Sequence, residues 1–256
     1  MKKFLFFFTS LVLVCLMVSC DFFSKPLYSF SRDISGVVSS MSTADLVGNV
    51  DSLSSDPKKA ADVLNVLADR DQDEISNLPK DDKEKLLNAG TSAILPVSQL
   101  GDMVEQLTKE GETVDMTSIM DSLTQGAPAI NTKALETVLE DEEILKTTDA
   151  STLALSAASL IVNTVKTESG EGSSFEDKMK DFQEVAATVN TDTFDKENFE
   201  SQLKEKGFSE ESASALSAAM GVTNVLTGER KDDAASVGFG GMTIADLLDQ
   251  MSGGKE

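Results

Sequence analysis

Alternating acids at Asp69, Asp71 and Asp73 match the opening of an EF-hand loop, in which carboxylate oxygens bind calcium. That loop also needs glycine at its sixth position and a bidentate glutamate at its twelfth. Glu74 and Lys80 occupy those two positions in this chain. We therefore expect the three aspartates to cap helix ends, and we expect no metal site.

Two other patterns suggest catalysis without completing it. Ser55 and Lys58 have the S-x-x-K spacing in which a lysine activates a serine, but the accompanying S-D-N and K-T-G elements are missing. The consecutive acids Glu140 to Glu143 could supply paired carboxylates for acid–base chemistry, although such runs on a helix face are usually only solvated. The 256-residue chain has no histidine, the commonest general base and metal ligand. The sequence therefore predicts no catalytic residue, no cofactor and no enzymatic activity.

The first residues of the chain have the layout of an export signal. Lys2 and Lys3 precede an apolar run from Phe4 to Val18, and Asp21 follows soon after it. A membrane span needs about 20 apolar residues, so this shorter run is typical of a secretory signal peptide.

The end of this leader resembles the lipobox of bacterial lipoproteins. Residues 17–20 read MVSC, with a small residue before a cysteine that is diacylated in that family and becomes the new N-terminus. The methionine and serine depart from the usual box and resemble the relaxed boxes of spirochaete lipoproteins. Cys15 is the weaker candidate because a bulky valine precedes it. The expected lipidation site is Cys20; an ordinary cleaved signal peptide and an uncleaved anchor are the alternatives.

Cysteine usage agrees with lipidation, since the chain has only two cysteines and cleavage removes Cys15. A modified Cys20 would leave neither a disulfide nor a free thiol in an oxidising compartment. The resemblance implies a lipid anchor in the inner or outer membrane, with the protein facing the periplasm or the cell surface. Two or more acyl chains are enough for stable anchoring. The resemblance covers only the leader, and no family is recognised for the rest of the chain.

The charge of the chain excludes one class of partner. The sequence holds 22 Lys and Arg against 44 Asp and Glu, a net charge of −22, and loss of Lys2 and Lys3 with the leader lowers it to −24. Such a surface repels the phosphates of nucleic acids and of anionic lipid headgroups. We therefore expect no nucleic-acid binding, contact with the membrane through the N-terminal lipid, and a protein partner.

Helical signals fill the chain after the leader. Apolar residues recur at spacings of three and four, which predicts an all-α, multi-helix bundle of about nine to ten short-to-medium helices. Residues 20–40 are expected to form a tether and residues 41–256 a single helical domain, with two lobes joined near 167–174 as an alternative. Helix-start signals lie at Ser42–Asp45, Asp56–Pro57, Asp71–Glu74, Asp81–Glu84 and Ser174–Asp177.

One segment stands out as a central helix. Residues 153–165 are apolar or small on nearly every face but are too few to span a bilayer, so they should lie in the core. Residues 215–226 share the string LSAA and an asparagine at the same offset, Asn163 against Asn224. Duplication of a helix pair and chance convergence of Ala-rich helices both explain this similarity. Further patterns predict a kink or a break of the helix at Pro96 and short helices near 116–126 and 244–251, the last of them preceded by a Gly-rich stretch from Gly228 to Gly241.

Three functions fit these observations. The first is a non-catalytic binding or structural lipoprotein that meets a protein partner through its acidic helical surface. The second is a carrier or receptor for an apolar small ligand held between helices, since bundles can build cavities there. The third and weakest is a histidine-free hydrolase.

Overall fold

The computed structural model describes residues 38–53, 56–94, 130–170, 173–189, 194–236, 238–239 and 242–243. All of them lie within one compact unit of the chain, residues 37–256. Over these ranges the chain is a packed domain of eleven helices, with a single antiparallel pair of two-residue strands. The expected all-α fold is confirmed. The export signal with Cys20, most of the tether, Pro96 and the helices expected near 116–126 and 244–251 lie outside the described residues.

The helices in chain order are α4 (Thr43–Leu53), α5 (Pro57–Ala68), α6 (Gln72–Ser76), α7 (Lys80–Ile94), α10 (Lys133–Leu139), α11 (Glu142–Thr147), α12 (Ala150–Glu168), α13 (Phe175–Ala186), α14 (Lys196–Glu205), α15 (Glu210–Thr227) and α16 (Lys231–Ser236). The strands are β1 (Gly238–Phe239) and β2 (Met242–Thr243). None of the described helices is both long and apolar enough to cross a bilayer.

Polar side chains fix the starts of several helices, as the sequence predicts. The start predicted at Asp81–Glu84 is wrong, because α7 begins at Lys80 and Asp81 lies in its first turn. Asp56 accepts a hydrogen bond from the Lys58 backbone N–H, and Pro57 takes the first helical position of α5. Ser174 and Asp177 form a complete capping box at α13, each side chain accepting from the other residue's backbone N–H. Each such bond satisfies a donor that the helix itself leaves unpaired.

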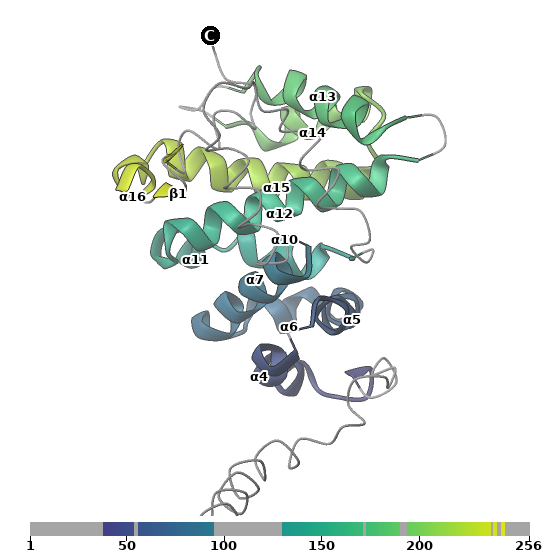
Figure 1. Ribbon diagram of the computed structural model, residues 1–256, viewed down its shortest axis with the longest axis vertical. Helices are drawn as coiled ribbons and strands as arrows, with labels where there is room; N and C mark the ends of the chain where they lie inside the picture. The colour runs from purple at the N-terminus through teal and green to yellow at the C-terminus, as the bar shows by residue number, and fades with distance from the viewer. Residues whose placement is uncertain are drawn as a thin grey trace, which may run out of the picture. The chain divides into compact units, whose positions relative to one another are not determined.

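Helices α12 and α15 form the antiparallel centre of the domain, and Figure 1 shows them side by side. Glu168 at the end of α12 accepts hydrogen bonds from the backbone and hydroxyl of Ser209, the N-cap of α15. At the opposite end, Arg230 after α15 donates to the Leu145 and Thr148 carbonyls just before α12. Helix α7 packs on α12, and α14 packs on α15.

The two similar segments of the sequence meet in this centre. Residues 153–165 are central as predicted, since all but Leu155 are buried. The segment that resembles them, residues 215–226, belongs to the partner helix α15.

Small and hydroxylated residues line this centre. Ser156 of α12 pairs with Thr91 of α7 across 3.2 Å between their hydroxyl oxygens. Ser159 and Ser217 are 0% and 1% exposed, and their hydroxyls find no partner among the described residues. A buried hydroxyl without a partner lowers stability. Ser159 and Ser217 therefore contribute to the packing through their small size and not through hydrogen bonds.

Helices α13 and α14 carry the aromatic part of the core. The rings of Phe182 and Phe199 meet edge to face with centroids 6.4 Å apart. Gly207 ends α14 with φ of +79°, in the left-handed region that glycine adopts without strain.

The described residues of the Gly-rich stretch from Gly228 to Gly241 include regular structure. The stretch contains α16 and the strand β1, which pairs with β2. Arg230 anchors this stretch through the two carbonyls before α12 and also bonds Asp233. Ala234 is fully buried. These long-range partners order a stretch whose glycines alone suggest a loop.

Gly90 allows α7 to approach α10 closely. A Cβ added at Gly90 would lie 2.6 Å from both Cδ atoms of the buried Leu135, whereas one added at Gly48 of α4 meets nothing within 4 Å. We expect Gly90→Ala to lower the free energy of unfolding by about 1–2 kcal/mol because of overpacking. Gly48→Ala should raise it by about 0.5–1 kcal/mol through helix propensity. Urea denaturation measures both, and equal stabilisation by the two variants would show that α7 and α10 are not this close.

The two buried serines of α12, Ser156 and Ser159, should respond oppositely to removal of the hydroxyl. Ser159→Ala removes an unpaired buried hydroxyl and should stabilise the protein by about 1 kcal/mol. Ser156→Ala leaves the Thr91 hydroxyl without its partner and should destabilise by about 1 kcal/mol. Thermal unfolding compares the variants directly, and a loss of stability in Ser159→Ala would reveal a partner for that hydroxyl.

Candidate functional site

Of the three acids that resemble a calcium loop, Asp69 and Asp71 lie at helix caps, whereas Asp73 lies in the first turn of α6 and caps no helix end. Asp69 lies at the C-cap of α5. Asp71 is the N-cap of α6, and its carboxylate accepts from the Asp73 backbone N–H at 3.0 Å. Across the described ranges, no three His, Cys, Asp or Glu side chains gather where a metal ion could bind.

The S-x-x-K pattern gains no support from its surroundings. Lys58 is exposed in the first turn of α5, and its backbone N–H donates to the N-cap Asp56 at 3.1 Å. Ser55 lies outside the described residues.

The acids Glu140 to Glu143 do not share one helix face, contrary to the sequence-based interpretation. They span the junction where α10 ends and α11 begins, because Glu140 is the C-cap of α10 and Asp141 is the N-cap of α11. Asp141 pairs at 2.5 Å with Lys83, whose side chain is 7% exposed, and this hydrogen bond lowers the pKa of Asp141. Glu140 pairs with Lys196 of α14. These carboxylates therefore join helices and are not merely solvated.

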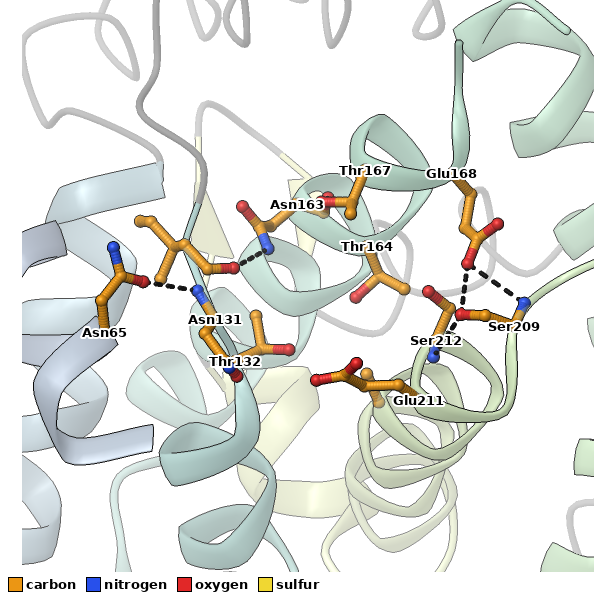
Figure 2. A pocket seen from close by; sticks show the side chains of 12 residues that line it. Asn65, Asn131, Thr132, Asn163, Thr164, Thr167, Glu168, Ser209, Glu211 and Ser212 are labelled. Carbon is orange, nitrogen blue, oxygen red and sulfur yellow. Dashed lines mark hydrogen bonds between the residues drawn. The ribbon is translucent and has the colours of Figure 1, made fainter. Parts of the chain in front are cut away.

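The described part of the chain also forms a pocket of about 370 Å³, lined mostly by residues with polar side chains, that no sequence pattern indicated. Figure 2 shows its walls, which come from α5, the segment before α10, α12 and α15. It is lined by Asn65, Ile130, Asn131, Thr132, Asn163, Thr164, Thr167, Glu168, Ser209, Glu211, Ser212 and Ala215.

Asparagine side chains hold one wall in place. The Asn65 side-chain oxygen accepts from the Asn131 backbone N–H at 2.7 Å. The Asn163 amide donates to the Ile130 carbonyl at 3.0 Å (Figure 2). These bonds tie the extended segment before α10 to α5 and to α12, so the wall is fixed by neighbouring helices.

The junction of α12 and α15 forms the opposite wall. Burial disfavours the ionised form of Glu168, but hydrogen bonds from Ser209 and Ser212 outweigh burial and lower the pKa of this carboxyl. Glu168 is therefore a carboxylate at neutral pH, and it is held in one position by the N-terminus of α15.

Two polar groups in the pocket have no side-chain hydrogen bond or ion pair within the described ranges. Thr164 is 3% exposed, and its hydroxyl oxygen finds no hydrogen-bond partner among the described residues. The Glu211 carboxylate forms no ion pair or side-chain hydrogen bond within the described ranges. Figure 2 shows both side chains pointing toward the space beside Thr132. The pocket can therefore offer hydrogen bonds and negative charge to a bound molecule.

Glu136 lies behind this space, on α10. Its side chain is 7% exposed and accepts a hydrogen bond from the Thr132 hydroxyl at 2.8 Å. Burial raises the pKa of Glu136 to about 7, against the opposing effect of Thr132, and the nearby charges of Glu211 and Glu140 add to the rise.

Of the lining residues, the sequence analysis singled out Asn163 by name, for the internal similarity of two helices, and it linked none of them to a pocket. The lining comes from positions far apart in the chain, and tertiary packing brings them together. An asparagine in an otherwise apolar core helix is the one signal that could have pointed here, since buried amides need partners.

Comparison of this chain with protein-family models, with curated proteins and with solved structures finds no match.

The raised pKa of Glu136 makes stability depend on pH. The folded state binds this proton more tightly than the unfolded state, so the contribution of Glu136 to stability falls as pH rises from about 4.5 through about 7. We expect Glu136→Gln to be more stable than the wild type by about 3 kcal/mol near pH 8 and equally stable near pH 4.

Chemical denaturation across this pH range measures the difference, with the exposed Glu143→Gln as the matched control. A Glu136→Gln variant whose advantage is the same at both ends of the range would contradict the burial of an ionisable carboxyl at this position.

Proposed function

We propose that this protein is a non-catalytic binding lipoprotein of the bacterial cell envelope, anchored through lipid on Cys20. The leader sequence supports the anchor and the extracytoplasmic location. The pocket between α12 and α15 is the observation that carries the binding function, because it combines a cavity with bonding groups that have no partner among the described residues.

Support for a non-catalytic role comes from the positions of the hydroxyl groups. The Ser209 hydroxyl donates to Glu168 and accepts from the Ser212 backbone N–H, so it serves as a helix cap. The Thr132 hydroxyl donates to Glu136. Within the described ranges, no lysine or histidine lines the pocket to activate a nucleophile. These groups are placed to hold a molecule, which favours binding over the hydrolase alternative.

The lining favours a polar ligand over the apolar one considered from the sequence. Ile130 and Ala215 are the apolar members of the lining, and the others carry amide, hydroxyl or carboxylate groups. An apolar molecule would leave the buried Thr164 hydroxyl, which has no partner among the described residues, still unpaired, and this would oppose binding.

Charge supports a protein partner as a second function. The expected mature chain has a net charge of −24, since the leader carries two of the 22 basic residues and none of the 44 acidic ones. Such a surface attracts a basic protein at long range, and this attraction weakens as salt is added.

Cysteine variants test the anchor. With the full chain expressed in a bacterium and labelled with palmitate, we expect Cys20→Ser to lose the label and to move from the detergent phase to the aqueous phase on detergent phase separation. Cys15→Ser is the matched control and should behave like the wild type. Label retained in Cys20→Ser, or lost in Cys15→Ser, would refute lipidation at Cys20.

A further inference from the structure

We propose that the pocket between α5, the segment before α10, α12 and α15 binds a small polar organic cation, a molecule with a primary ammonium group and several hydroxyl or amide groups. This inference rests on the proposed binding function and adds the chemical class of the ligand.

The charge in the pocket selects a cation. Glu168 and Glu211 both line it, and no lysine, arginine or histidine of the described ranges does. Glu168 stays ionised because Ser209 and Ser212 hydrogen-bond its carboxylate. An anion in this space would face two carboxylates with no basic residue in the described lining, whereas an ammonium group would be attracted to both carboxylates.

Glu211 is the carboxylate most open to a ligand. Glu168 already bonds the N-cap of α15, but Glu211 has no partner of this kind in the described part of the chain. Figure 2 shows the Glu211 carboxylate directed into the pocket from the first turn of α15. It can therefore pair with an ammonium group without first breaking an internal bond.

The Thr164 hydroxyl is independent of this charge argument. It is almost completely buried, has no partner among the described residues, and points into the same space as Glu211. A buried hydroxyl without a partner lowers stability, and a hydrogen bond to a ligand hydroxyl or amide would remove that loss. The ligand therefore needs polar groups in addition to its charge.

The other lining residues narrow the kind of cation. Quaternary ammonium groups are usually held by aromatic faces, and none of the described residues that line the pocket is aromatic. A primary ammonium instead donates three hydrogen bonds, which suits carboxylate, hydroxyl and amide oxygens. The volume of about 370 Å³ lies at the lower end of ligand pockets, so the molecule is small.

Matched probes test the proposal on the full chain purified in detergent. Calorimetric titration compares glucosamine with glucose, its neutral counterpart, and glucuronate serves as the anionic probe. Putrescine has two ammonium groups and neither a hydroxyl nor an amide, so it measures what charge alone contributes. We expect glucosamine to bind with one-to-one stoichiometry, about tenfold or more tighter than glucose and more tightly than putrescine.

Variants distinguish the pocket from the acidic surface. Glu211→Gln should weaken the bound cation by about tenfold or more, while the exposed Glu143→Gln should leave its affinity unchanged. Thr164→Val should weaken binding, and Thr164→Ser, which keeps the hydroxyl, should restore it. Circular dichroism confirms that each variant is folded.

Three other outcomes would each reject the cation, the site or the binding function. A neutral or anionic probe that binds more tightly than its cationic counterpart, and depends on Thr164, would reject the cation while the binding function stands. Cation binding that responds equally to Glu211→Gln and Glu143→Gln would assign it to the surface and reject the site. If no probe binds and native mass spectrometry of the freshly purified chain shows no retained small molecule, both the cation and the binding function of the pocket are rejected.

Discussion

The close antiparallel packing of α12 and α15 is the constraint on which the rest of the described domain depends. Small side chains let the two helices approach, and α7 and α14 pack on their outer sides. This packing lowers the free energy of unfolding in one respect, because Ser159 and Ser217 bury hydroxyls that have no partner in the described structure. Both ends of the pair are fastened by hydrogen bonds, Glu168 to Ser209 at one end and Arg230 to two carbonyls at the other. These hydrogen bonds fix the position of α12 relative to α15.

The candidate site follows from this pairing. Where α12 ends and α15 begins, the unpaired groups of two helix termini come together, and the sequence supplies polar side chains to satisfy them. Acids near the first turn of α15 also interact favourably with its positive end, which gives Glu168 and Glu211 a structural reason to be there. Glu168 uses its carboxylate for this purpose, while Glu211 and the Thr164 hydroxyl remain available for a bound molecule. The stability of the domain and the proposed binding of a small molecule thus depend on the same helix junction.

The sequence predicted the features that depend on interactions between residues close together in the chain. Helix starts at Asp56 and Ser174 were predictable because a cap bonds backbone groups two or three residues away. The partners of Glu140 and Asp141 were not, because Lys196 and Lys83 are distant in the chain and only folding brings them near. The pocket escaped prediction for the same reason, since its residues are separated by up to 150 positions, Asn65 to Ala215. Order in the glycine-rich stretch around Arg230 likewise depends on carbonyls that precede α12.

Amide hydrogen exchange of the full chain, followed by mass spectrometry, tests the central role of the helix pair most directly. If α12 and α15 are the constraint that positions the other helices, amides of residues 153–165 and 215–226 should exchange slowest and together, through global unfolding. Helices at the edge of the described domain, α4 and α16, should open earlier. Exchange of residues 153–165 as fast as that of α4, or well before that of residues 215–226, would contradict the account.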